Sequence, residues 1–149
     1  MSDTDGMLIP LEVLFRRRKG TSMTTQALTA ATFEQTVLEN DIVLVDFWAS
    51  WCGPCVMFGP VYEAASAAHP DIVCAKVDTE AEQSLAASAQ ITSIPTLMAF
   101  REGILVFSQP GALPAASLEQ VIAGIRALDM DDVRAKVAEN SLAHANADN

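Results

Sequence analysis

Short apolar runs and apolar residues at helical spacing alternate along the chain and predict its secondary structure. Runs rich in β-branched and aromatic residues predict strands at 41–49, 71–78, 96–100 and 104–108. Apolar residues that recur every three or four positions predict helices at 32–38, 54–68, 81–89 and 118–128. The first two strands are apolar on both faces, which is typical of strands buried inside a sheet.

The order of these elements predicts an α/β fold. One helix and one strand alternate along most of the chain, and two successive strands and a final helix complete it, which favours a central mixed sheet sandwiched by helices. The last two strands are joined only by Arg101–Gly103, a connection short enough for an antiparallel hairpin. Pro54 suits the first turn of the second helix, and Pro70 ends that helix.

The two ends of the chain depart from this pattern, so we predict one domain at 23–128. Residues 1–22 are interpreted as a disordered leader, either added for expression or lying upstream of a natural start at Met23. The basic cluster Arg16–Lys19 follows an apolar patch, which is the reverse of the order in a secretory signal. A polybasic tether is the alternative interpretation of this cluster. Residues 129–149 predict a marginal helix followed by a flexible tail.

Charge and hydropathy argue against two classes of partner. The formal net charge is −10, and between Met23 and Leu128 only Lys76, Arg101 and Arg126 oppose eleven acidic residues. Nucleic acid is therefore not an expected partner, because a phosphate-binding surface must be basic. The longest apolar runs fall far short of the roughly 20 residues that span a membrane, so no membrane association is expected either.

Two cysteines two residues apart, Cys52 and Cys55, are the candidate for chemistry. A tetrahedral zinc site would need two more ligands, and the chain offers only Cys74, His69 and His144, none of them in a second paired motif. We therefore expect no metal. A purely structural disulfide across so short a loop would stabilise the fold little.

A working redox pair fits the surroundings better. Cys52 falls where a strand gives way to a helix, so the amides and dipole of the helix N-terminus favour its thiolate, the attacking species. Gly53 and Pro54 allow a tight turn that places Cys55 one turn into the helix. Cys52 can then attack a substrate disulfide, and Cys55 can resolve the mixed disulfide and leave a Cys52–Cys55 disulfide. Trp51 offers a flat apolar contact for the substrate.

An acid inside an apolar strand, Asp46, needs its own explanation. It is either an edge-strand residue that faces water, or a buried carboxyl group beneath the cysteine pair. In the second case burial raises its pKa and lets it exchange a proton with Cys55. Lys76 is the candidate counter-charge, and the alternative is that its side chain simply extends to solvent.

Together, these segments resemble the thioredoxin family, in its bacterial CGPC-type form. The motifs are "VDFWA", "WCGPC", "AKVDTE", "ITSIPT" and "PGAL", and the match covers roughly residues 27–128. The resemblance implies the thioredoxin fold and a cis peptide bond between Ile94 and Pro95, facing the cysteines. Asp46 and Lys76 match the family's buried acid and its lysine partner. The residues that match the family's substrate groove are Trp51, Gly53, Pro54, Ile94, Pro95 and Gly111.

The resemblance also implies an activity: reduction of protein disulfides in the cytoplasm, with no bound cofactor. Electrons are expected from NADPH through a separate, flavin-containing thioredoxin reductase, and the other partners are oxidised protein substrates. A monomer is the default expectation. The chain departs from the family at Val56, where most members carry Lys or Arg. This departure concerns efficiency and the choice of reductase, not the reaction class. Two alternative functions stay open for other reasons, an isomerase-like oxidant and a redox-silent docking module with the same fold.

Overall fold

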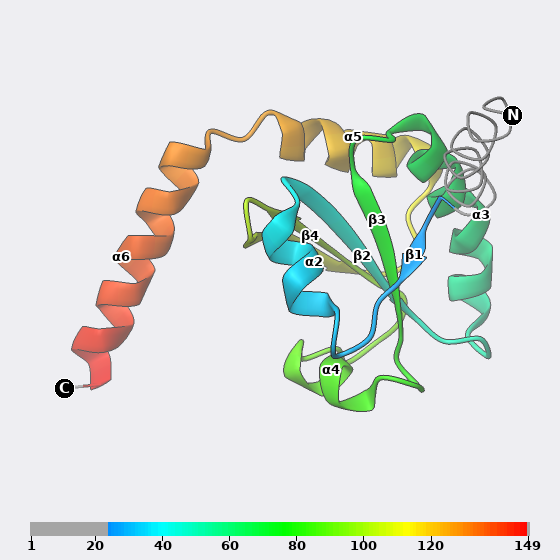
Figure 1. Ribbon diagram of the computed structural model, residues 1–149, viewed down its shortest axis with the longest axis horizontal. Helices are drawn as coiled ribbons and strands as arrows, with labels where there is room; N and C mark the ends of the chain where they lie inside the picture. Colours follow the sequence, from blue (N-terminus) through cyan, green and yellow to red (C-terminus); the bar gives the residue numbers. More distant parts are fainter. Residues whose placement is uncertain (1–23, 149) are drawn as a thin grey trace, which may run out of the picture. The chain divides into compact units, whose positions relative to one another are not determined.

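The computed structural model describes residues 24–148 (Figure 1), and the side chains are described as far as Leu142. The interpretation of 1–22 as a leader falls outside the described residues. The chain divides into two compact units between Ala115 and Ala116, and each is described by itself. The predicted domain limits, 23 and 128, stay a prediction.

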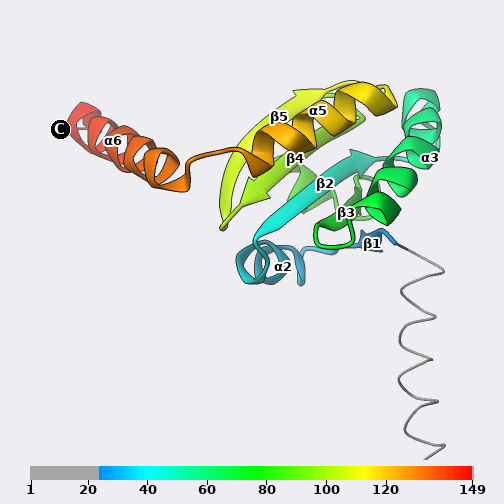
Figure 2. The ribbon, with the colours of Figure 1, turned by 90° about the horizontal axis from the view of Figure 1, so that it is seen from above.

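The first unit is built on a mixed sheet, as predicted, and this sheet has five strands rather than the four predicted. Its strands are ordered β1-β3-β2-β4-β5, so that β2 lies at the centre (Figure 2). The strands β1, β3 and β2 are parallel, whereas β4 runs antiparallel to both β2 and β5. The strand limits are Gln26–Ala27 for β1, Ile42–Trp48 for β2, Val73–Asp78 for β3, Thr96–Arg101 for β4 and Ile104–Pro110 for β5.

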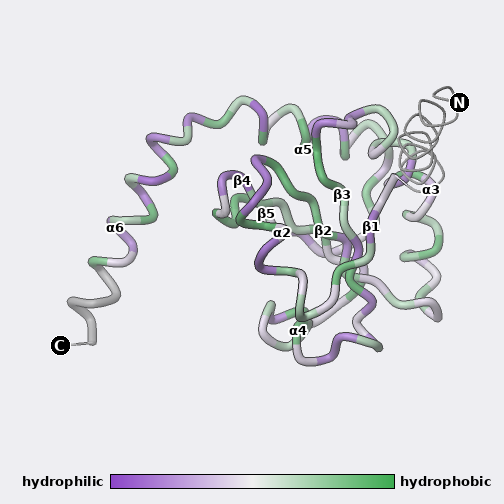
Figure 3. The backbone as a smooth tube through the Cα atoms, viewed as in Figure 1, coloured by the Kyte–Doolittle hydropathy of each residue, from purple (hydrophilic) through white to green (hydrophobic). Residues whose placement is uncertain are grey.

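One face of this sheet packs against α2 (Phe33–Glu39) and α4 (Gln83–Ser88). The buried core on this side combines strand residues from β2, β3 and β4 with Val37 of α2, and Phe33 and Leu85 pack against its margin. Alternate side chains of a strand point to opposite faces, so Val43, Val45 and Phe47 all reach this core. Figure 3 shows β2 and β3 as largely hydrophobic along their lengths, as expected of central strands.

The other face is covered by α3 (Gly53–Ala68). Phe58 and Tyr62 of this helix are buried, and the Tyr62 hydroxyl donates a hydrogen bond of 2.8 Å to the carbonyl oxygen of Ala75 on β3. Leu44 and Asp46 alternate with the residues of the first core and therefore point toward α3. Burial first, and then the nearby Cys74 and Asp46, raise the pKa of Tyr62.

The strand β1 was not predicted from the sequence. It has only two residues, both exposed, and is aligned by its pairing with Ala75 and Lys76 of β3. No run of apolar residues marks it, because the hydrogen bonds to β3 rather than side-chain burial hold it in place.

The second unit contains α5 and α6. The predicted apolar stripe of α5 (Ala115–Arg126) is present, with Leu118, Ile122 and Ile125 buried. The helix α6 runs over Met130–Asp148 and so occupies the segment for which a marginal helix and a tail were predicted. Its exposed surface carries two ion pairs at helical spacing, Arg134 with Asp131 and Lys136 with Asp132. Within residues 24–148, no helix is long and apolar enough to cross a membrane.

Candidate functional site

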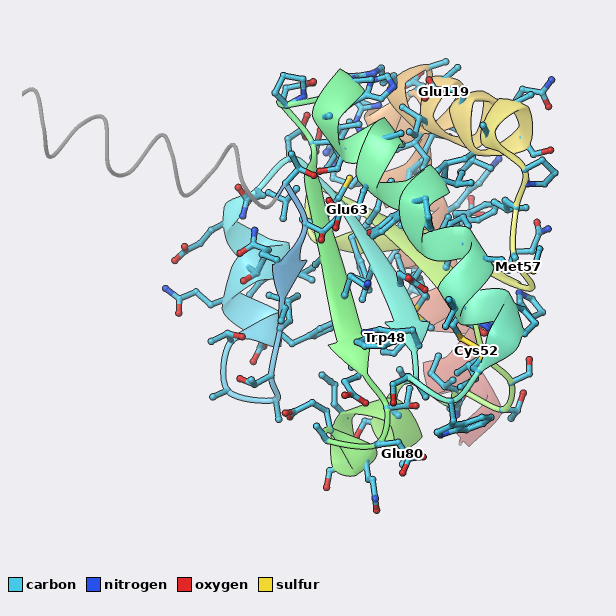
Figure 4. The ribbon with its side chains drawn as sticks, turned by 90° about the vertical axis from the view of Figure 1, so that its right-hand side faces the viewer. Trp48, Cys52, Met57, Glu63, Glu80 and Glu119 are labelled. Atoms are coloured by element: carbon cyan, nitrogen blue, oxygen red, sulfur yellow. A yellow bond between two sulfur atoms is a disulfide. The ribbon has the colours of Figure 1, made fainter. Side chains whose placement is uncertain are left out.

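The cysteine pair lies where β2 leads into α3. Cys52 is the N-cap residue of α3 and Cys55 lies in its first turn, with Pro54 at the start of the helix. The two cysteines form a disulfide, visible as the yellow bond beside the Cys52 label in Figure 4. Both are buried, at 4% and 3% exposure. The sequence-predicted position of the pair is therefore the observed one.

The start of α3 presents a hydrogen-bond donor to the first sulfur. The Cys55 backbone amide donates to Cys52 Sγ at 3.2 Å, in the manner of an N-cap bond. An amide and a helix dipole that point at sulfur stabilise a negative charge there. The local backbone thus favours the thiolate of Cys52 once the disulfide is reduced.

A second loop, which contains a cis peptide bond between Ile94 and Pro95 as predicted, faces the disulfide. Cys52 Sγ lies 3.7 Å from the carbonyl oxygen of Ile94. Ile94 and Trp48 also pack against a small buried cluster of Ala49 and the two cysteines. Two segments 42 residues apart in sequence therefore meet at Cys52 Sγ.

A pocket of about 470 Å³ opens over Cys52. Four of the predicted groove residues line it, namely Trp51, Gly53, Pro54 and Ile94. Five further lining residues were not singled out from the sequence as site residues, although all but Ala86 lie in the quoted motifs "AKVDTE" and "ITSIPT": Thr79, Ala86, Ile91, Thr92 and Ser93.

Two predicted groove residues, Pro95 and Gly111, do not line this pocket. They are joined to each other instead, because the Gly111 amide donates a hydrogen bond of 2.7 Å to the Pro95 carbonyl oxygen. Gly111 has a φ of 101°, a conformation that residues with a Cβ rarely adopt. Gly111 therefore supports the loop that carries the cis bond.

Glu80 is a further residue at this site that the sequence did not single out. The Trp51 indole donates from Nε1 to Glu80 Oε2 at 3.2 Å. Glu80 follows β3 in a turn that is closed by Asp78 Oδ1, which accepts hydrogen bonds from the amides of Glu80 and Ala81. Only its position in "VDTE", directly after a strand that ends beside the cysteine loop, could have indicated it.

Asp46 is buried at 1% exposure, in the central strand of the sheet. The edge-strand alternative is therefore wrong, because β3 and β4 flank β2 on both sides. Neither carboxyl oxygen has a hydrogen-bond partner among the described residues. Burial raises the pKa of Asp46 to about 7, against the opposing effect of the positive charge on Lys76.

Lys76 is the residue of β3 that pairs with Asp46 in the sheet. Its ammonium group lies 4.5 Å from the centre of the Trp48 ring, a cation–π contact that holds the side chain partly buried. It lines a second pocket, of about 450 Å³, together with Glu63. Burial works against ionisation of Glu63, but hydrogen bonds from Thr24 and Thr25, with the charge of Lys76, hold its pKa below the usual range.

The third cysteine, Cys74, is free and buried in β3. Burial raises the pKa of its thiol to about 11, although a hydrogen bond with Ser66 works in the opposite direction. Such a thiol is unreactive at neutral pH. Among the described residues, no three His, Cys, Asp or Glu side chains are grouped so that they could hold a metal ion.

Comparison with known proteins gives a consistent result. The family model "Thioredoxin" matches residues 24–124. "Putative thioredoxin 2" of Streptomyces coelicolor is 60% identical over 115 residues, which cover 77% of this chain and 86% of that protein. "Thioredoxin 1" of Synechococcus elongatus is 47% identical over 98 residues, which cover 64% of this chain and 92% of that protein. Among solved structures, the thioredoxin of Plasmodium falciparum matches with a TM-score of 0.63 and 34% sequence identity. The match covers 67% of this chain and 98% of that one.

Proposed function

The chain belongs to the thioredoxin family, and from this we propose that it reduces protein disulfides through Cys52 and Cys55. Its relatives imply a thiol–disulfide oxidoreductase. The observation that supports the finer proposal is the Cys52–Cys55 disulfide, which lies at the N-terminus of α3 beneath an open pocket. The Gly53-Pro54 spacer is the one found in the reducing members of the family.

The first step is attack by Cys52. In the reduced protein, the Cys52 thiolate attacks one sulfur of a substrate disulfide. A new bond forms between Cys52 Sγ and that sulfur, the substrate S–S bond breaks, and the other substrate sulfur leaves as a thiolate that takes up a proton. The carbonyl of Ile94 and the ring of Trp51 border the pocket in which the substrate chain would lie.

The second step is resolution by Cys55. Its thiol loses a proton, and the resulting thiolate attacks Cys52 Sγ of the mixed disulfide, so that the substrate leaves as its second thiolate. Two electrons have then passed from the dithiol to the substrate, and the Cys52–Cys55 disulfide has formed. We assign Asp46 as the acceptor of the Cys55 proton, because a carboxyl group with a pKa of about 7 can take up and release a proton near neutral pH.

The oxidised protein must then be reduced again. We propose NADPH as the source of electrons, through a separate flavin-containing thioredoxin reductase, because the chain has no GxGxxG dinucleotide fingerprint of its own. The other partners are oxidised proteins. The proposed compartment is the cytoplasm, where a reducing thiol pool exists.

The equilibrium redox potential of the Cys52–Cys55 pair, measured against a dithiothreitol buffer by tryptophan fluorescence, tests this proposal together with insulin reduction. We expect a potential near the −270 mV that is typical of thioredoxin, and loss of turnover in Cys52→Ser. A potential near −180 or −120 mV would favour the isomerase-like or oxidant alternative. A variant with both cysteines replaced by serine that kept its cellular role would favour the docking module.

A further inference from the structure

Much of the chain that forms the site around Cys52 lacks charged residues, although the protein is acidic. Three segments contribute to the site, 47–62 with the cysteines, 83–100 with the cis bond and 103–115 with Gly111, and none of them contains a charged residue. Directly after the second cysteine stands Val56, where the family resemblance implies a Lys or Arg. Any charge that a docked substrate meets must therefore come from elsewhere.

Three large apolar side chains close to Cys52 in the sequence are exposed to solvent, Trp51 just before it and Val56 and Met57 in the first two turns of α3. Trp51 is 68% exposed, Val56 60% and Met57 76%, and we call these three residues the apolar ledge. Only four other large apolar side chains of the described residues are comparably exposed, and they are scattered over α2, β5 and α6. Figure 4 shows Met57 on α3 in the turns next to Cys52. Clustered exposed apolar side chains are typical of a protein-binding surface.

The loop after β3 supplies the charge that the rest of the site lacks. Glu80 is exposed and accepts the indole hydrogen bond of Trp51, so its carboxylate is held at the margin of the ledge. The turn at Asp78 fixes the backbone of Glu80. Figure 4 shows Glu80 on the same side of the molecule as Cys52. A docked chain thus meets apolar side chains and one fixed negative charge.

We infer that the substrate-docking surface of this chain extends beyond the pocket, over Val56 and Met57 on one side and to Glu80 on the other. This inference rests on the proposed function. The occupant that fits is an oxidised protein segment whose disulfide is flanked by an apolar side chain and by a lysine or arginine. A positive charge on the substrate complements Glu80 and raises the association rate, whereas a negative charge lowers it. The acidic body of the domain strengthens both the attraction and the repulsion.

The charge preference is tested with two disulfide-bonded peptides that differ only in one residue beside the cysteine, lysine in one and glutamate in the other. We expect the reduced protein to react about two- to fivefold faster with the lysine peptide at low salt, as for one exposed ion pair. The ratio should fall toward one in 1 M salt, where the screening length is about 3 Å. Glu80→Gln should abolish the preference, whereas the matched control Glu34→Gln, on α2, should keep it.

The outcomes separate this inference from the proposed function. If neither peptide is reduced, the proposed function fails. If both are reduced at the same rate, or if Glu80→Gln keeps the preference of the unaltered chain, the docking inference is overturned while the reductase stands. The salt dependence also distinguishes a charge effect from a mere displacement of Trp51, because the latter would not vary with ionic strength.

The apolar part of the surface is tested with Met57→Gln, and Leu38→Gln serves as its matched control, because Leu38 is also exposed on a helix. We expect Met57→Gln to raise KM about threefold or more for a peptide with a leucine beside the disulfide, and to change KM much less for hydroxyethyl disulfide, which has no flanking chain. Leu38→Gln should leave both values unchanged. Equal KM values for the peptide in the two variants would overturn the role of Met57.

Discussion

Replacing Asp46 with asparagine should stabilise the oxidised protein in alkaline solution, by an amount that follows from its burial. Burial raises the pKa of this carboxyl group from 3.8 to about 7. A tenfold change in proton affinity corresponds to about 1.4 kcal/mol, so the ionised group costs the folded state about 4 kcal/mol above pH 7. Asparagine carries no charge at any pH and has nearly the same volume.

The sign of the pH dependence follows from proton binding. The unfolded chain releases the Asp46 proton near pH 4, whereas the folded chain keeps it until about pH 7. Between these values the folded state binds more protons, so its free energy of unfolding falls as the pH rises. Between pH 5 and pH 9, the free energy of unfolding of the unaltered protein should therefore fall by about 3 kcal/mol relative to that of Asp46→Asn.

Urea unfolding of both oxidised proteins, followed by tryptophan fluorescence at several pH values, measures this difference. The oxidised form is the right one, because its active-site cysteines do not titrate. The buried amide of asparagine lacks hydrogen-bond partners just as the carboxyl group does, but that cost is the same at every pH and leaves the slope unaffected. Glu34→Gln, at an exposed position on α2, controls for the change in net charge.

A difference between Asp46→Asn and the unaltered chain that stayed constant from pH 5 to pH 9 would refute the reasoning. It would mean that water or Lys76 stabilises the carboxylate as well in the folded state as in the unfolded chain. A difference that grew with pH to about 3 kcal/mol would support the raised pKa and, with it, the role of Asp46 as a proton acceptor near neutral pH.

Three further predictions use other features of the site. Gly111→Ala should lower the free energy of unfolding by about 1 kcal/mol in urea denaturation, because φ is 101° there, while the described residues other than its chain neighbours leave the added Cβ more than 4 Å of space; an unchanged value would contradict this. Tyr62→Phe should cost about 1 kcal/mol in the same assay, through loss of the buried hydrogen bond to Ala75, and a neutral effect would show that this bond adds nothing net. Cys55→Ser should accumulate a mixed disulfide between Cys52 and an oxidised substrate, visible on a non-reducing gel, whereas Cys52→Ser should not.

Much of the fold could be predicted because burial leaves a clear pattern in the sequence. The strands β2 and β3 are mostly apolar runs, interrupted by Asp46 in β2 and by Lys76 and Asp78 in β3, and the stripe of α5 has helical spacing. The strand β1 could not be predicted, because Gln26 and Ala27 are held by backbone pairing and have exposed side chains. The cis bond at Pro95 was predicted only through the family resemblance, since "SIPT" alone indicates no more than a turn.

Some features of the candidate site could likewise be predicted from the local sequence, and others could not. The position of Cys52 followed from the change of strand to helix, which is a local signal. The burial of Asp46 did not, because an acid in an apolar strand is compatible with an edge strand until the strand order is known. The contact between Glu80 and Trp51 joins residues 29 positions apart and depends on where two loops end in space, so no local pattern records it.

The carboxyl group at the centre of the sheet has a consequence for how this chain would respond to selection. A library screened only for heat resistance in alkaline medium should be enriched early in neutral residues at position 46, because each of them removes the cost of a buried charge. A screen that requires disulfide turnover should restore the acid. The residue at position 46 would thus show whether a population was selected for stability or for disulfide turnover. Sequencing a single codon is enough to read it.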